Sequence, residues 1–181
     1  MNNKKLLVFS DTHGHLSPLK AVFNWAKDCI PPNGSICCTA FLGDGLSDLR
    51  MAADAAGFYS EWKLIRGNND YDSNMPETAL LDYGDHRFFM CHGHRHNLHG
   101  DYRTLITAGR TAGADVVLFG HSHVPFQKTV NGTLLVNPGS VGRPRSRIGA
   151  TFAVIECATG CPPTAEFYGI GSRGEIKAVK V

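Results

Sequence analysis

Short apolar runs alternate with amphipathic helical patterns through the first half of the chain, and this alternation most limits the fold. Ser17 and Pro18 are typical of a helix start, with Ser17 as N-cap, and Gly57 is typical of a C-terminal cap. Strands that alternate with helices indicate an α/β fold, in which helices cover a sheet. The predicted strands span residues 5–10, 36–42 and 62–66, and the predicted helices span residues 17–30 and 47–56.

Hairpins replace this alternation in the second half. Gly84-Asp85 and Asn131-Gly132 each separate two short apolar runs, and Asn-Gly is the strongest local hairpin signal in the sequence. One more helix, capped by Asp101, is expected before a buried strand. We therefore expect a mixed sheet, or two stacked sheets, covered by helices. The predicted strands are 79–83, 86–91, 115–119, 127–130, 133–136, 151–157 and 164–170, the helix is 102–113, and 174–181 is an edge strand or a loose end.

Composition limits the class of protein. The chain has 181 residues, 43% hydrophobic, which suits a single domain spanning residues 1–181. A net charge of +2 without a long basic run gives no electrostatic case for a nucleic-acid or membrane partner. The N-terminal apolar segment is too short for a secretory signal, so a cytoplasmic location is expected. The six cysteines are expected to be reduced, and a Cys157–Cys161 disulfide is the less favoured alternative.

Polar side chains follow five of the predicted strands, at the point where each strand ends. In α/β sheets this edge is where sites are built. Each residue alone is better explained as a turn or surface residue, but five strand ends that offer ligand-type side chains are hard to attribute to chance. The residues are Asp11, His13, Asp44, Asn68, His92, His121 and His123.

The types of these side chains indicate a metal site. Two aspartates, one asparagine and four histidines, with no cysteine, suit Mn, Fe, Zn, Co or Ni rather than Ca. Seven ligands are too many for one ion of four to six positions and suit two ions that share one carboxylate. Paired metals of this kind are the usual device for hydrolysing phosphate esters.

Six motifs then carry a family resemblance. SDTHGH, GDGLSD, GNND, HGH, GHSH and NPGS occur in the order found in the calcineurin-like metallophosphoesterases. The chain resembles most the small YfcE-type phosphodiesterase branch, which is similar in size and fold to the retromer scaffold subunit Vps29. The resemblance covers the chain from Leu6 to about Gly142.

This resemblance implies a fold and a set of ligands. The fold is a four-layer α/β/β/α sandwich of two mixed β-sheets flanked by helices, known as the metallo-dependent phosphatase fold. Two divalent ions are implied, with manganese favoured and zinc, iron, nickel or cobalt as alternatives. One ion is held by Asp11, His13 and His123, the other by Asn68, His92 and His121, and Asp44 bridges them, with His94 as the alternative to His92.

The implied reaction is hydrolysis of phosphate diesters by in-line attack of a metal-bridging hydroxide. Asp44 and Asn68 take part in catalysis, and Asn68 also touches a phosphoryl oxygen. Arg95, Arg143 and Arg145 are candidates to stabilise negative charge, and surface arginines without a role are the equal alternative. The NPGS motif at residues 137–140 is expected to pack beneath the site.

One position departs from the wider family. Asn69 stands where many members carry a histidine that is proposed to protonate the leaving group or bind phosphate. An amide cannot serve as a general acid, so His15 or His94 would supply the proton, or metal and water would do so. Good leaving groups are expected to react best. His96 and His99 are expected to be surface residues.

Two other functions stay open. One is a phosphomonoesterase or protein phosphatase, and the other is a non-catalytic scaffold similar to Vps29. A scaffold is expected to lose ligand histidines, whereas this sequence keeps all seven ligand-type residues. The expected partner is a small phosphate-ester substrate, and a homo-oligomer is left open.

Overall fold

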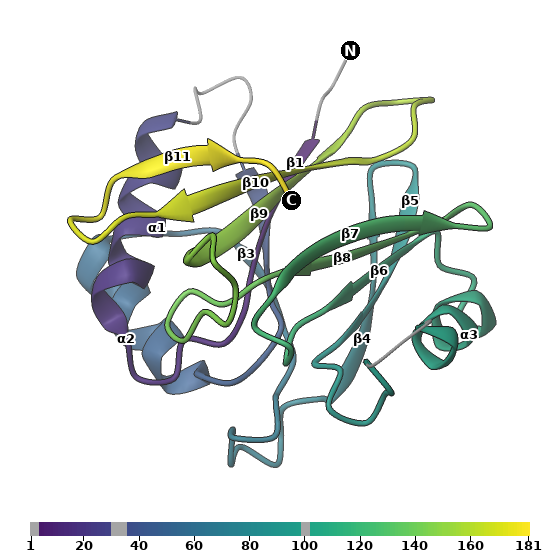
Figure 1. Cartoon of the computed structure of the whole chain (residues 1–181), viewed down its shortest axis with the longest axis horizontal. Helices are drawn as coiled ribbons and strands as arrows, with labels where there is room; N and C mark the ends of the chain where they lie inside the picture. The colour runs from purple at the N-terminus through teal and green to yellow at the C-terminus, as the bar shows by residue number, and fades with distance from the viewer. Residues whose placement is uncertain (1–3, 30–35, 99–101) are drawn as a thin grey trace.

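Two mixed β-sheets form the framework of the protein (Figure 1). The structure is a computed structural model that describes residues 4–29, 36–98 and 102–181. The first sheet has the strand order β11-β10-β9-β1-β2-β3, and the second has the order β4-β5-β6-β8-β7. The strands of the first sheet are β1 (Lys4–Phe9), β2 (Ile36–Phe41), β3 (Glu61–Leu64), β9 (Ala150–Cys157), β10 (Thr164–Ile170) and β11 (Ile176–Val179). Those of the second are β4 (Thr78–Tyr83), β5 (His86–Cys91), β6 (Val116–Phe119), β7 (Pro125–Val130) and β8 (Thr133–Pro138).

Helices cover the outer faces of both sheets, as Figure 1 shows. Helices α1 (Leu16–Cys29) and α2 (Leu46–Ala56) lie on the first sheet, and α3 (Arg103–Thr111) lies on the second. Three buried clusters separate the layers. Leu6, Met90 and Leu118 belong to the cluster between the two sheets. Phe9 and Phe23 belong to the cluster under α1 and α2. The expected four-layer sandwich is therefore confirmed.

Parallel strands form one side of the first sheet and the centre of the second. The loops that follow their carboxyl ends lead to the site. Strand β1 pairs in parallel with β2, and β2 with β3, whereas β9 runs antiparallel to β1. In the second sheet β5, β6 and β8 run parallel, and β4 and β7 are antiparallel edge strands. The loops that leave β1, β2, β5 and β6 carry six of the seven predicted ligands.

The turn and cap residues expected from the sequence are confirmed at positions where the backbone needs a positive φ. Gly57 ends α2 with a left-handed φ of 59°. Asn131 and Gly132 both have positive φ, as a tight hairpin between β7 and β8 requires. The chain's last residues form β11, an edge strand rather than a loose end. Cys157 and Cys161 are free, so no disulfide joins them.

Boundaries were wrong in several places. Helix α1 begins at Leu16, so Ser17 lies inside it and is not the N-cap. Strand β3 ends at Leu64, four residues before Asn68, because the chain then crosses toward the second sheet. The predicted cap Asp101 lies outside the described residues, and Tyr102 precedes α3 with a left-handed φ of 56°. None of the described helices has the length and apolar character needed to cross a membrane.

Candidate metal centre

The predicted ligands stand on an unusual backbone. Seven described residues other than glycine have positive φ, and five of them are predicted ligands: Asp11, His13, Asp44, His121 and His123. Such a conformation costs free energy for a residue with a Cβ, so it persists only where surrounding contacts impose it. The chain supplies those contacts as hydrogen bonds between loops, for example from the Asp11 and Thr12 amides to the Gly43 and Asp44 carbonyls. This concentration of strain marks the edge where a site has been built.

The first group of side chains surrounds Asp11. Its carboxylate is fully buried, and Oδ1 lies 3.1 Å from His123 Nε2 and 3.7 Å from His13 Nε2. The two imidazole Nε2 atoms are 3.2 Å apart. Three ligand atoms from two distant parts of the chain therefore converge within bonding reach of one ion.

The second group lies beside it. His92 Nε2 is 3.4 Å from Asp44 Oδ2 and 3.9 Å from Asp11 Oδ1, and all three side chains are buried. Asn68 and His121 line the same cavity as Asp44. The structure thus brings all seven predicted ligands to one place. Asp11 belongs to both compact groups, whereas the sequence assigned only Asp44 to both ions.

Six buried side-chain atoms have no hydrogen-bond partner among the described residues, and two of them are ligand atoms of this cluster. These two are Asp11 Oδ1 and His92 Nε2, which face each other in the middle of the cluster. Buried polar atoms without a partner are rare, and each calls for a ligand or an ion. His92 Nδ1 lies 2.7 Å from the Leu42 carbonyl and His123 Nδ1 lies 2.6 Å from the Arg143 carbonyl. Each Nδ1–H donates to its carbonyl, which leaves Nε2 as the free lone pair that a divalent metal requires, so the residues fit a metal centre.

The electrostatics of the cluster favour charged carboxylates. Burial alone raises the pKa of Asp11, yet contacts with the imidazoles of His123 and His13, and the positive charge of His92 whenever that ring is protonated, hold this pKa below its ordinary value. Burial likewise opposes ionisation of Asp44, but His92 and Asn69 lower its pKa to about 2. Both carboxylates are therefore negative at neutral pH and available to cations.

Asp70 holds the second group from below. Its two carboxylate oxygens accept hydrogen bonds from the backbone N–H groups of Asp44, Gly45, Leu46 and Gly67, at 2.7 to 3.0 Å. These donors include the first amides of α2, so Asp70 also acts as that helix's cap from another segment. Asp70 therefore braces the loop that carries Asp44.

Asn69 has a partner that the sequence did not reveal. Its side-chain amide donates to Asp44 Oδ2 at 2.6 Å, and its backbone N–H donates to Asp44 Oδ1 at 2.8 Å. The residue that replaces the family's histidine therefore orients a predicted ligand. It offers no proton to a leaving group.

Gly67 and Gly120 make room for the carboxylates. A Cβ on Gly67 would lie 2.1 Å from Asp44 Oδ1, and a Cβ on Gly120 would lie 2.9 Å from Asp11 Oδ2. Gly67 has no positive φ, so backbone conformation is not the reason that glycine stands here. It is required because a side chain would displace Asp44.

The NPGS motif packs beneath the first group, as expected. The Asn137 side chain donates to the Gly120 carbonyl at 2.8 Å. The Ser140 hydroxyl donates to the Asp11 carbonyl at 2.7 Å and accepts from the Arg143 N–H at 2.7 Å. The motif therefore ties the loop after β8 to the loop after β1.

The predicted cations separate into two sets. Arg143 and Arg145 line a cavity of about 420 Å³ together with His13, Asp44, Asn68, Asn69, His121 and His123. Arg95 instead pairs with Glu77 at 2.8 Å, and Arg66 pairs with the same Glu77 oxygen at 2.6 Å. This ion triad joins the loop of Asn68 to the loop of His92. The guanidinium group of Arg95 is therefore already paired with a carboxylate.

His94, His15 and His96 are not among the residues that line the cavity. The His94 ring is 5.6 Å from that of His92, and burial together with the charge of His92 lowers the pKa of His94. His94 is thus mostly unprotonated at neutral pH, which disfavours it as an acid; its catalytic role stays a prediction. His15 is exposed and His96 is half-buried. His99 lies outside the described residues.

Sequence reasoning missed Asp48. This buried residue of α2 accepts hydrogen bonds from the Thr12 hydroxyl at 2.5 Å and the Gly14 N–H at 2.7 Å. It therefore holds the loop that carries Asp11 and His13. The available signal was its place as the last residue of GDGLSD.

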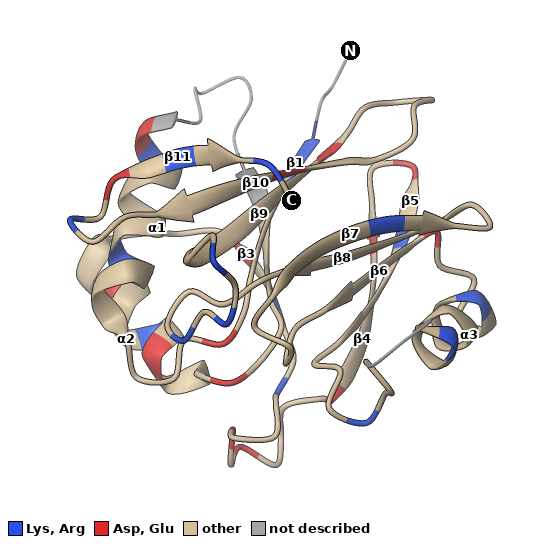
Figure 2. Cartoon of the chain, in the orientation of Figure 1, with Lys and Arg blue, Asp and Glu red and all other residues tan. Residues whose placement is uncertain are grey.

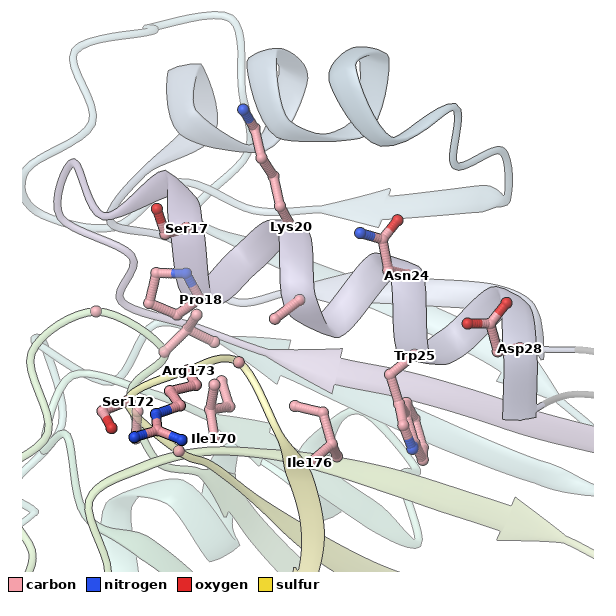
Figure 3. A pocket seen from close by; sticks show the side chains of 16 residues that line it. Ser17, Pro18, Lys20, Asn24, Trp25, Asp28, Ile170, Ser172, Arg173 and Ile176 are labelled. Atoms are coloured by element: carbon pink, nitrogen blue, oxygen red, sulfur yellow. The ribbon is translucent and has the colours of Figure 1, made fainter.

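A larger cavity lies elsewhere in the molecule. It encloses about 820 Å³ between α1 and the turn from β10 to β11 (Figure 3). Trp25 on α1 lies opposite Ile170 and Ile176, and no histidine is among its lining residues. This larger cavity therefore does not share the histidine-rich lining of the smaller one.

Comparisons with known proteins agree with this geometry. Residues 5–160 match the family model described as "Calcineurin-like phosphoesterase superfamily domain". The chain is 28% identical over 166 residues to YsnB of Bacillus subtilis, named as a probable metallophosphoesterase, which covers 90% of this chain and 89% of that relative.

Solved structures show the same fold. Vps29 of Entamoeba histolytica, complexed with Zn²⁺, is similar with a TM-score of 0.76, 21% identity and coverage of 98% of both chains. YfcE, a phosphoesterase from E. coli, is similar with a TM-score of 0.64 and 18% identity, over 97% of this chain and 98% of that one.

Proposed function

Because this chain belongs to the calcineurin-like phosphoesterase superfamily, we propose that it is a dinuclear-metal phosphodiesterase. The resemblance expected from the sequence is confirmed, and the family is one of metal-dependent phosphoesterases. The preference for diesters and the use of two ions are our own proposals.

One observation carries the proposal. Buried Asp11, Asp44 and His92 enclose two ligand atoms, Asp11 Oδ1 and His92 Nε2, that lack hydrogen-bond partners among the described residues. A chain that used this fold only as a scaffold would have no reason to keep such costly atoms unpaired. We assign Asp11, His13 and His123 to one ion, Asn68, His92 and His121 to the other, and Asp44 to both.

When bound, the two ions would supply the positive charge that activates water and stabilises the phosphoryl group under attack. The chain's own groups position the reaction. The Leu42 and Arg143 carbonyls fix the tautomers of His92 and His123. Asn69 holds the Asp44 carboxylate in place. The exposed Asn68 amide lies at the cavity wall, where it can donate to a phosphoryl oxygen.

The shape of the cavity favours a diester. Its rim residues Asn68, Asn69, Arg143 and Arg145 are exposed, so the cavity opens to solvent. A phosphorus atom that carries two organic groups can therefore reach the ligands with both groups directed outward. A deep, closed site would admit only a monoester.

Hydrolysis of two aryl esters by metal-loaded protein tests this function. Protein freed of metal with a chelator is reloaded with Mn²⁺, Zn²⁺, Fe²⁺, Co²⁺ or Ni²⁺ and assayed on bis(4-nitrophenyl) phosphate and 4-nitrophenyl phosphate. We expect kcat/KM for the diester to exceed that for the monoester by roughly tenfold or more. Turnover of the monoester alone would indicate a phosphomonoesterase. Turnover of neither ester with any ion would indicate a scaffold.

Manganese is the ion we propose, since carboxylate, amide and imidazole together suit it. The same assay compares the ions directly. The highest kcat/KM with another ion would overturn this choice. A cytoplasmic location and a homo-oligomer stay predictions.

A further inference from the structure

Two arginines at the metal cavity have no acidic partner. Arg143 and Arg145 are exposed and line the cavity, and neither forms an ion pair with a described carboxylate. Arg66, Arg87 and Arg95, by contrast, each pair with a glutamate or aspartate. Figure 2 shows the basic stretches on the loop between β8 and β9. Two unpaired guanidinium groups at one cavity are suited to bind an anion.

The backbone that carries these arginines is held firmly. The Gly142 N–H donates to the Asp11 carbonyl at 3.1 Å, and the Arg145 N–H donates to the His123 carbonyl at 3.1 Å. The Arg143 carbonyl accepts from the His123 ring. Pro144 restricts the backbone between the two arginines. The loop that carries the two guanidinium groups is thus hydrogen-bonded directly to the segments that carry two predicted ligands.

The same cavity lacks a proton donor for a leaving group. Asn69 replaces the family's histidine and is bound to Asp44. The other described residues of the wall are predicted ligands, the two arginines and Pro144. Among the described residues, this wall therefore favours a leaving group that departs as an anion and is stabilised by charge rather than by a proton.

Both observations fit one class of leaving group. We propose, on the basis of the phosphodiesterase function above, that the preferred substrate is a diester of diphosphate, such as a dinucleoside diphosphate. Arg143 and Arg145 would bind the departing phosphate. This phosphate is an anion that leaves without protonation, whereas an alkoxide needs an acid.

The reaction balances without any further reactant. The oxygen of one water molecule forms a bond to the attacked phosphorus, and the bond from that phosphorus to the bridging oxygen breaks. The bridging oxygen keeps the electron pair and stays on the departing phosphate. The products are two phosphate monoesters, and two protons pass to solvent.

The charges also match. The four positive charges of two divalent ions would be balanced by four negative charges. These are the charges of Asp11, Asp44, a hydroxide nucleophile and the attacked phosphoryl group. Arg143 and Arg145 then add two positive charges, and a simple diester has no further negative charge to pair with them. A departing phosphate carries about that much negative charge.

A matched pair of substrates tests the proposal. P¹,P²-di(thymidine-5′) diphosphate and thymidine 5′-(4-nitrophenyl phosphate) both release thymidine 5′-phosphate, and both have a leaving group that departs without protonation. We expect R143A and R145A each to lower kcat/KM for the diphosphate by roughly tenfold or more, and for the nitrophenyl ester by less than about threefold. R145K should recover part of the loss because it restores the charge but not the bidentate geometry.

Arg147 provides the control. It is an exposed arginine on the same loop that does not line the cavity, so R147A should change neither rate. Calorimetry supplies a readout other than turnover. The methylene-bridged analogue of the diphosphate should bind metal-loaded R143A and R145A roughly tenfold more weakly than wild type, while thymidine 5′-phosphate binds equally.

Three outcomes would overturn the proposal. The first is an equal loss on both substrates in the arginine variants. The second is wild-type turnover of the nitrophenyl ester without turnover of the diphosphate, which would leave the phosphodiesterase function intact. Turnover of neither substrate by metal-loaded protein would remove both proposals.

Discussion

The two halves of the proposed metal centre are held in different ways. The half formed by Asp11, His13 and His123 is locked by buried contacts: Ser140 and Gly142 bind the Asp11 carbonyl, and the Arg143 carbonyl binds His123. The half formed by Asn68, His92 and His121 depends more on acidic side chains. Asp70 gathers four amides beneath Asp44, and Glu77 joins the loops of Asn68 and His92 through two arginines.

This difference indicates separate sensitivities. Hydrogen bonds between buried backbone groups change little with ionic strength or with the charge of nearby side chains. The ion pairs of Glu77 are partly exposed, so they are weaker and are screened by salt. A substitution at a residue that supports only one half should therefore weaken binding of the ion in that half and leave binding of the other ion unchanged.

The largest effect should come from the residue assigned to both halves. Asp44→Asn should lose both ions and lower kcat/KM on the order of 10³-fold, because a neutral amide replaces the shared carboxylate. Metal content by mass spectrometry and the aryl-ester assay measure this. If Asp44→Asn keeps one ion while Asp11→Asn loses two, Asp11 is the shared ligand instead.

Removal of the carboxylate beneath the second half should cost the most stability. Asp70→Ala leaves four amides without their acceptor, and we expect a loss of about 3 kcal/mol in the free energy of unfolding. Urea denaturation measures it. Asp72→Ala in the same loop removes one exposed hydrogen bond and should cost less than about 0.5 kcal/mol. Equal losses in the two variants would contradict the role of Asp70.

A pair of milder substitutions separates the halves. Ser140→Ala should weaken binding of the first ion roughly tenfold, and Glu77→Gln should weaken binding of the second to a similar degree. Titration of the apo protein with Zn²⁺, followed by the ring ¹⁵N signals of His123 and His92, shows which half fills. Asp82→Asn breaks an exposed pair on β4 and serves as the control. If both signals shift together in each variant, the halves are not independent.

The smallest effect should be a gain. Asn69→His should raise activity on a poor leaving group, such as that of thymidylyl-thymidine, by roughly a few fold, because a histidine can donate a proton. The gain is limited because the bond from Asn69 to Asp44 is lost. The slope of kcat/KM against leaving-group basicity should become shallower. An unchanged slope would argue against a proton-transfer role at this position.

The sequence predicted the presence and order of the strands well, because apolar runs and turn residues are local signals. The four-layer arrangement and the grouping of the ligands were predicted from the order of six motifs along the whole chain. No single segment of the sequence contains that information. Boundaries failed where long-range contacts decide them, as at Leu64, where β3 stops because the chain leaves the first sheet. The site's backbone strain at residues such as His123 was not predictable, since it is imposed by loops from other strands.

Supporting residues were the hardest to predict. Asp70 stood out because it follows two asparagines in a turn. Asp48 and Glu77 act through partners 34 and 18 residues away in the chain. In the sequence alone, neither residue differs from an ordinary charged surface residue. Arg143 and Arg145 were indistinguishable from solvated arginines until the cavity showed that they face the ligands.

The distance along the chain between partners has a consequence for synthesis. His13 and His123 meet across 110 residues, and Ser140 reaches back 129 residues to Asp11. A growing chain on the ribosome therefore has no complete set of ligands until His123 has emerged, and Asp11 lacks the support of Ser140 until β8 has emerged as well. Metal capture should be one of the last events in maturation, so cofactor occupancy in freshly made protein would report how much of it has finished folding.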